Sequence, residues 1–67
     1  MKKLHTSIVD TLSNFLSIDE SSKIAFNALE FGYNSKKRLR FRLYDELVDY
    51  FSESKAFSIA NQAIKNI

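Results

Sequence analysis

Apolar residues recur at helical spacing along most of this chain, and that pattern limits the fold more than any other feature. The clearest run has apolar side chains at every fourth position, Leu39, Leu43, Leu47 and Phe51. Residues spaced in this way line one face of an α-helix. Similar stripes recur in three other segments, and the sequence contains no proline and a single glycine, Gly32. The pattern therefore predicts an all-α fold.

The stripes predict a small bundle of about four short helices, over residues 4–16, 18–31, 36–51 and 55–66. Short polar breaks lie between these segments. Ser17 and Glu20 have the spacing of a capping box at a helix start, and Gly32 suits the left-handed position just after a helix end. Ser35 and Ser54 are candidate N-caps for the last two helices. No internal repeat is evident, and we expect one domain over residues 1–67.

The segment over residues 36–51 also supports a second interpretation. Over residues 38–43 arginines alternate with apolar residues, which is the pattern of a half-buried strand. The charges also run against one unbroken helix, because cations fill its first turns and carboxylates its later ones, the reverse of what the helix macrodipole favours. A helix remains preferred because the apolar stripe is long and its neighbours are helical. A break, a strand or strain is expected near residues 42–45.

The length of the chain limits how it is stabilised. A domain of 67 residues buries only about 60% of the surface that its unfolded chain exposes, and such domains often add a disulfide, a metal or a second subunit. The sequence has no cysteine and one histidine, His5, so neither a disulfide nor a zinc site is expected. We therefore predict no metal and a homodimer.

No catalytic constellation is present in the sequence. His5 has no nucleophile beside it, the serines fit helix caps and turns, and no glycine-rich phosphate loop occurs. We therefore expect a protein that is not an enzyme, with no catalytic residues, no cofactor and no small-molecule substrate. No apolar run approaches the roughly 18–20 residues of a membrane span, and the basic start lacks a continuous apolar stretch. The expected location is cytoplasmic.

One short segment holds half of the positive charge. Five of the ten Lys and Arg residues, including every arginine, lie within residues 36–42, whereas the rest of the chain has more carboxylates than cations. Arginine forms bidentate contacts with phosphates and guanine edges, and aromatic residues beside it can stack. The predicted binding residues are Lys36, Lys37, Arg38, Arg40, Arg42 and Tyr44.

Two functions fit this segment. The first is a small regulatory protein that binds DNA or RNA through residues 36–44. The second is a helical protein–protein interaction module (an adaptor, inhibitor or assembly factor) whose basic segment meets an acidic protein surface. The many aromatic residues, six Phe and three Tyr, are compatible with either function.

Two family resemblances accompany these hypotheses. Residues 37–67 resemble the ribbon-helix-helix repressors: an alternating segment is followed by Leu43-Tyr44-Asp45-Glu46-Leu47 and then by a helix opened by Ser58. This resemblance implies a dimer whose three arginines point from a two-stranded ribbon into the DNA major groove. Residues 9–65 also resemble, more faintly, the helical cytoplasmic module of the inner-membrane platform proteins of type II secretion and type IV pili, on residues 17–20 and 54–60. The transmembrane helices of that family have no counterpart in this sequence.

Overall fold

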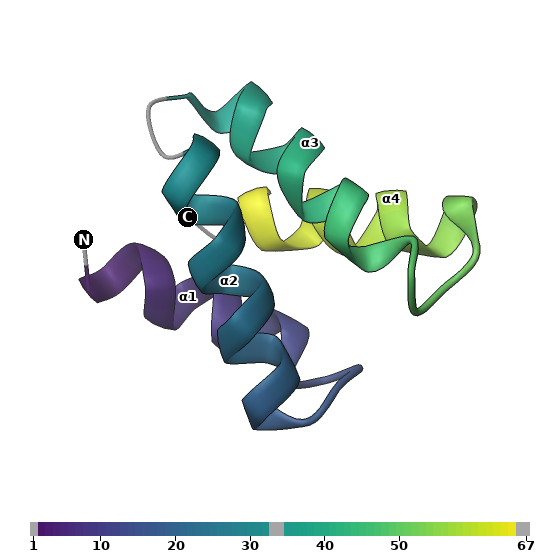
Figure 1. Ribbon diagram of the computed structural model, residues 1–67, viewed down its shortest axis with the longest axis horizontal. Helices are drawn as coiled ribbons and strands as arrows, with labels where there is room; N and C mark the ends of the chain where they lie inside the picture. The colour runs from purple at the N-terminus through teal and green to yellow at the C-terminus, as the bar shows by residue number, and fades with distance from the viewer. Residues whose placement is uncertain (1, 33–34, 66–67) are drawn as a thin grey trace.

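Four α-helices follow one another in the computed structural model, which describes residues 2–32 and 35–65 and the side chains within residues 4–30 and 35–65 (Figure 1). They are α1 (Lys2–Leu12), α2 (Ile18–Gly32), α3 (Lys36–Leu47) and α4 (Glu53–Lys65). The predicted all-α bundle is confirmed. The strand considered for residues 38–43 is not formed, because that segment is continuous helix.

Two helices are shorter than the apolar periodicity predicts. The helix expected to reach residue 16 ends at Leu12, and the helix expected to reach residue 51 ends at Leu47. In both places the backbone continues to turn. The N–H groups of Leu16 and Phe51 donate to the carbonyl oxygens of Leu12 and Leu47, at 2.9 and 3.0 Å. These bonds hold the next apolar side chains in helical register after the regular helix has ended.

Serine side chains cap the helix starts. Ser17 accepts a hydrogen bond from the Glu20 N–H at 3.2 Å and its hydroxyl donates to the Glu20 carboxylate, as the capping box predicts. Ser35 is the N-cap of α3. The expected cap at Ser54 is wrong, since α4 already begins at Glu53 and Ser52 Oγ accepts from the Lys55 N–H. Gly32 is the last residue of α2 rather than the residue after it.

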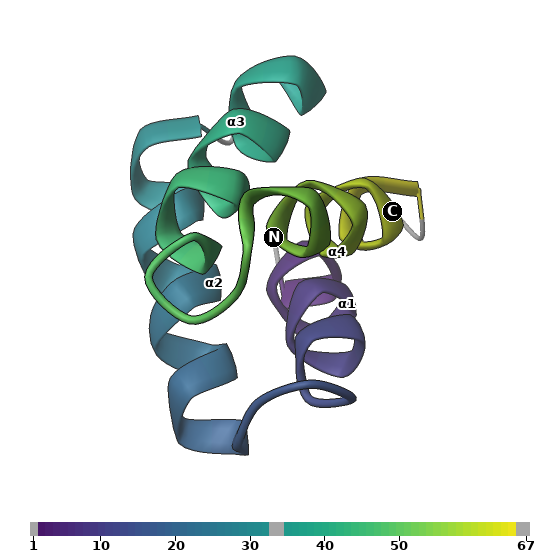
Figure 2. The same cartoon turned by 90° about the vertical axis from the view of Figure 1, so that its right-hand side faces the viewer.

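The core receives apolar side chains from every helix. α1 packs on α2, α2 on α3, α3 on α4, and α4 back on α1, so the contacts close into a ring (Figure 2). Small alanines on α2 and α4 allow these helices to approach their neighbours closely. The Cα radius of gyration is 10.1 Å, close to the roughly 11 Å of an ordinary globular chain of this length. The buried apolar residues are Ile8, Leu12, Ile24, Ala25, Ala28, Leu39, Leu43, Leu47, Ala56, Ile59, Ala60 and Ala63.

The structure also reveals an internal repeat that was not evident from the sequence. Adding 35 to a residue number in the α1–α2 hairpin gives the equivalent position in the α3–α4 hairpin. The turn hydrogen bonds recur at this shift: Phe15 N–H to Leu12 carbonyl matches Tyr50 N–H to Leu47 carbonyl, both at 2.9 Å. The cap at Ser17 matches the cap at Ser52. Exchanging the two hairpins also maps each helix contact of the ring onto another.

The repeat is hidden because it lies mostly at buried and capping positions. Most polar residues between these positions differ, although Asp10 matches Asp45 and Lys2 matches Lys37, so the similarity is spread thinly along the chain. The equivalent core pairs are Leu4 and Leu39, Ile8 and Leu43, Leu12 and Leu47, Ile24 and Ile59, Ala25 and Ala60, and Ala28 and Ala63.

Candidate nucleic-acid interface

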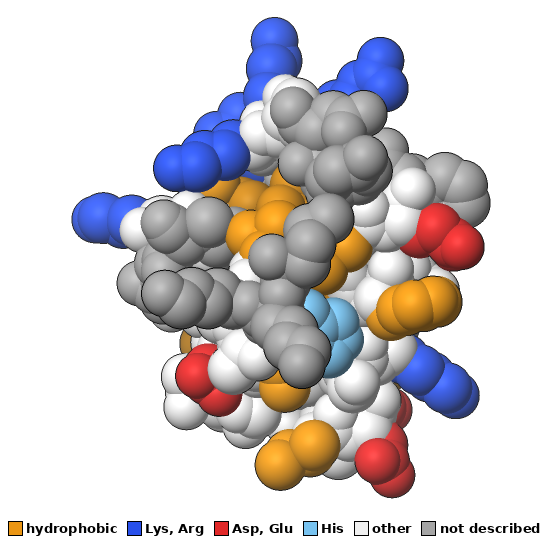
Figure 3. Space-filling model, turned by 90° about the vertical axis from the view of Figure 1, so that its left-hand side faces the viewer, with side chains coloured by type: hydrophobic (Ala, Val, Ile, Leu, Met, Phe, Trp, Pro, Cys, Tyr) orange, Lys and Arg blue, Asp and Glu red, His pale blue; other side chains and the backbone are white. Residues whose placement is uncertain are grey.

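The first turn of α3 carries three exposed cations, Lys36, Lys37 and Arg38. Ser35 caps this turn by accepting a hydrogen bond from the Arg38 N–H at 3.4 Å. A helix N-terminus has a partial positive charge because its first N–H groups point outward, and no acidic residue lies in this turn to offset it. Figure 3 shows Lys and Arg side chains projecting from the upper part of the molecule, where α3 begins. The start of α3 is therefore strongly electropositive.

Arg42 lies one helix turn beyond Arg38 and is neutralised locally. Its guanidinium contacts Asp45 Oδ2 and Glu46 Oε2, both at 3.3 Å. These pairs at i+3 and i+4 link the basic and acidic parts of α3. They help α3 to continue through residues 42–45, where the order of charges predicted a break. Of the predicted binding residues, Arg42 is the one whose charge is already matched by its own helix.

Arg40 points toward α4 rather than into the apolar stripe of α3. Its guanidinium carbon lies 6.0 Å from the centroid of the Phe57 ring, a distance at which a cation is attracted to the face of an aromatic ring. The side chain is half-buried. Phe57 thus gives an apolar surface to the stem of Arg40 and leaves the charged group at the edge of the molecule.

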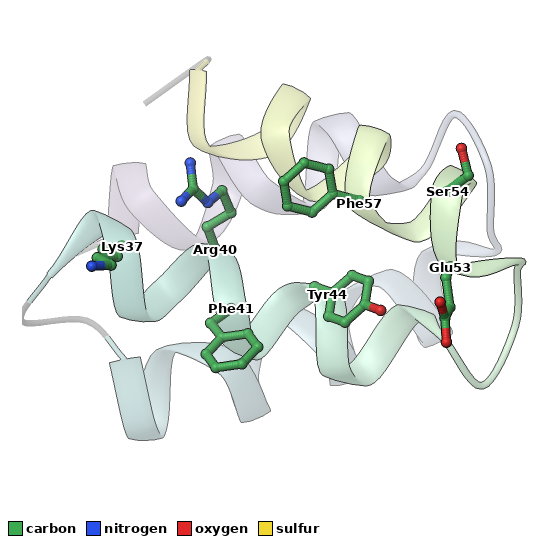
Figure 4. Close-up of a pocket in the computed structure, with 7 residues that line it drawn as sticks. All are labelled: Lys37, Arg40, Phe41, Tyr44, Glu53, Ser54 and Phe57. Carbon is green, nitrogen blue, oxygen red and sulfur yellow. The ribbon is translucent and has the colours of Figure 1, made fainter.

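Three aromatic rings form a row between α3 and α4, which we call the aromatic row: Phe41, Tyr44 and Phe57 (Figure 4). Phe41 stacks on Tyr44 with 6.5 Å between centroids and 27° between planes, and Tyr44 meets Phe57 edge-on at 6.1 Å. Phe41 is 71% exposed and Phe57 50% exposed. Two large apolar rings thus stand largely in solvent beside the cations.

The aromatic row is part of a groove of about 570 Å³ between α3 and α4. Lys37 and Arg40 lie toward one end of the groove, and Glu53 and Ser54 lie toward the other (Figure 4). The groove is therefore apolar along its length, basic at one end and acidic at the other. Its lining residues are Lys37, Arg40, Phe41, Tyr44, Glu53, Ser54 and Phe57.

The structure brings together some of the predicted site residues and separates others. Lys37, Arg40 and Tyr44 line the groove, Lys36 and Arg38 are exposed nearby on the same helix turn, and Arg42 turns to its carboxylates. Because α3 is a helix, the three arginines do not share one face as they would on a strand. The sequence did not identify Phe57 as a site residue. A comparison of the two hairpins could have done so, since a serine, Ser22, holds the equivalent position.

No protein-family model, curated protein or solved structure matches this chain. The two family resemblances therefore stay predictions. Among the described residues no helix is long and apolar enough to cross a membrane. In the same part of the chain, no three His, Asp or Glu side chains gather closely enough to hold a metal ion.

Proposed function

We propose that this protein is a small non-enzymatic regulatory protein that binds nucleic acid through the basic start of α3. The observation that carries the proposal is the exposure of Lys36, Lys37 and Arg38 on one helix turn, with Arg40 beside them. Clustered cations neutralise phosphates and release condensed counterions, which gives affinity for any polyanion. The N-terminal end of the helix adds to the same positive potential.

The remaining charges orient the bound polyanion. The far end of the α3–α4 hairpin carries three exposed carboxylates, at Asp45, Asp49 and Glu53. They repel phosphates and so favour contact at the start of α3 alone. The net charge of +2 thus conceals a positive end and a negative end, and such asymmetry steers association.

Binding is tested by fluorescence anisotropy with labelled DNA and RNA at about 50 and 200 mM salt. We expect Lys37→Gln/Arg38→Gln to weaken binding on the order of tenfold, because phosphate contacts dominate affinity. The matched control is Lys23→Gln/Lys65→Gln, which removes the same charge from exposed positions on α2 and α4. Absence of binding at low salt, or equal losses in both double variants, would contradict the proposal.

A homodimer and a cytoplasmic location belong to the same proposal. Ile18 and Phe26, both on α2, are 68% and 61% exposed, so apolar surface remains outside the groove for a second copy to cover. Sedimentation velocity at several protein concentrations tests the dimer. A dimer would be ruled out as the binding form if the protein kept the mass of a monomer at concentrations up to about 100 times its dissociation constant for nucleic acid.

The second candidate function is a helical protein–protein interaction module. The opposite charges at the two ends of the groove, Lys37 and Arg40 against Glu53, favour it, because an amphipathic helix with complementary charged ends fits an apolar groove of this kind. A pull-down that recovers one defined protein equally well with and without nuclease would support this function over nucleic-acid binding.

A further inference from the structure

The two hairpins separate what the fold requires from what it does not. Most buried positions carry the same or similar apolar residues in both hairpins, as at Leu12 and Leu47 or Ile24 and Ile59. In the aromatic row, Phe41 and Phe57 have no such counterpart, whereas Tyr44 matches Val9, and both of these pack against the core. At the positions equivalent to Phe41, Tyr44 and Phe57, the first hairpin carries Thr6, Val9 and Ser22. A helical hairpin of this design therefore folds without those three rings.

The equivalent surface of the first hairpin is also hollow but has different chemistry. It holds a depression of about 500 Å³ whose lining includes His5, Asp19 and Ser22, the positions equivalent to Arg40, Ser54 and Phe57. The hollow is thus a product of the hairpin geometry. The depression of the first hairpin also holds one cation, Lys23, and one exposed ring, Phe26. Among the described residues, the stacked pair of rings, Phe41 and Tyr44, belongs to the second hairpin.

Exposed rings beside cations match the chemistry of an unpaired nucleotide. Base-on-ring stacking contributes a factor of about five to 150 in affinity per base and tolerates any base, since each has a π-face. Phe41, with 71% of its surface exposed, offers a ring face to such a base. Lys37 and Arg40 line the same groove and lie where the phosphate on either side of that base would need a positive charge.

A duplex fits this surface less well than a single strand. The bases of a duplex are stacked on one another and present only their edges, so the open ring of Phe41 would gain nothing from them. The basic stretch from Lys36 to Arg40 is also only about 6 Å long along the helix axis, at a rise of 1.5 Å per residue. Beyond it the exposed carboxylates of Asp49 and Glu53 would repel the phosphates of a longer rigid ligand.

We infer that the groove between α3 and α4 binds single-stranded nucleic acid, with an unpaired base stacked on the aromatic row and its phosphates held by Lys37 and Arg40. This inference rests on the proposed function and adds to it the form of the nucleic acid and the role of the rings. The groove volume of about 570 Å³ lies within the range of pockets that hold small ligands.

The test measures the affinity of a labelled 12-nucleotide single strand and of the corresponding 12-base-pair duplex by anisotropy. Two variants carry the residue that the first hairpin has at the same position, Phe41→Thr and Phe57→Ser. The control, Tyr50→Ser, removes a similarly exposed ring from the turn after α3, outside the residues that line the groove. Circular dichroism and thermal unfolding check that each variant is folded.

We expect the wild-type protein to prefer the single strand by at least about tenfold. Phe41→Thr and Phe57→Ser are each expected to lower single-strand affinity by about fivefold or more, and Tyr50→Ser to leave it unchanged. A strand with abasic sites keeps its phosphates but has no base to stack. The wild-type protein should bind this abasic strand as weakly as Phe41→Thr binds the intact strand. Phe41→Thr itself should bind the two strands equally.

Different failures of this test have different meanings. Equal affinity for duplex and single strand, or unchanged single-strand affinity in both groove variants, would overturn the inference and leave nucleic-acid binding by the start of α3 intact. No binding of any nucleic acid at low salt would overturn the proposed function as well. If an acidic amphipathic peptide binds the groove and nucleic acid does not, the groove belongs to a protein partner and the inference is also overturned.

Discussion

The hydroxyl of Ser21 is fully buried in the second turn of α2, and among the described residues it has no hydrogen-bond partner. A buried hydroxyl without a partner loses its hydrogen bonds to water, which costs on the order of 1 kcal/mol or more. The equivalent position of the second hairpin is Ala56, also fully buried. Ser21→Ala is therefore expected to raise the free energy of unfolding by about 1 kcal/mol, measured by urea denaturation.

Ser22→Ala is the matched control for this substitution. Ser22 is half-buried in the same turn of α2, so its replacement changes helix propensity by a similar amount, roughly 0.5 kcal/mol. The difference between the two variants then isolates the buried hydroxyl. If Ser21→Ala is no more stable than Ser22→Ala, the hydroxyl is satisfied in solution and the prediction is wrong.

The two hairpins are joined where their turns meet. Phe15, in the turn after α1, meets Phe51, in the turn after α3, edge-to-face with 6.5 Å between centroids. Lys55 Nζ in the first turn of α4 lies 5.7 Å from the Phe15 centroid and 6.0 Å from the Phe51 centroid. One ammonium group thus contacts rings from both turns, which ties the end of α1 to the start of α4.

Replacing that lysine with methionine tests its role. Lys55→Met keeps a flexible apolar stem over the two rings and removes the positive charge. A partly exposed cation–π contact contributes about 0.5–1 kcal/mol, so we expect the free energy of unfolding to fall by about that amount. Lys23→Met, at an exposed position on α2, is the control and should change stability by less. A loss of equal size in both variants would show that the charge acts through general electrostatics alone.

Helix identity and the starts of α2 and α3 were predictable from the sequence, but the ends of α1 and α3 and the start of α4 were not. The i+4 stripe of α3 continues to Phe51 because a hydrogen-bonded turn holds that residue in register after the helix ends at Leu47. Periodicity cannot distinguish these two backbones. Ser54 was predicted as the cap of α4 where Ser52 is the cap, because both are serines in one polar break. The repeated hairpin would have indicated Ser52, since Ser17 and Ser52 are equivalent.

The candidate site was predictable in its charge and not in its groove. The concentration of cations at the start of α3 is local in sequence, and the exposure of Lys36, Lys37 and Arg38 follows from it. The removal of Arg42 from the site depends on side-chain pairing at i+3 and i+4, which competes with any outside partner. The place of Phe57 depends on how α4 packs against α3, and no local pattern carries that information.

The charge distribution of the protein as a single body sets the salt dependence that we expect of the proposed nucleic-acid binding. Residues 36–42 supply five of the ten cations, and the pairing of Arg42 with two carboxylates leaves Lys36, Lys37, Arg38 and Arg40 as the cations positioned to face phosphates. At most about four phosphates are therefore neutralised at once. Electrostatic attraction between this end and a polyanion speeds encounter, while the acidic end limits how much of the protein the polyanion covers.

A small number of phosphate contacts predicts a shallow salt dependence. For single strands the slope of log affinity against log salt is about −0.7 per neutralised phosphate, so three to four contacts give a slope of roughly −2 to −3. Anisotropy titrations between about 50 and 300 mM salt measure it directly. Lys37→Gln/Arg38→Gln should reduce the magnitude of the slope by about 1.4, because two contacts are lost, whereas Arg42→Gln should leave it nearly unchanged. In the proposed homodimer two copies of the site could act together. A slope steeper than about −6 would exceed what two such copies can give and would contradict a site confined to the start of α3.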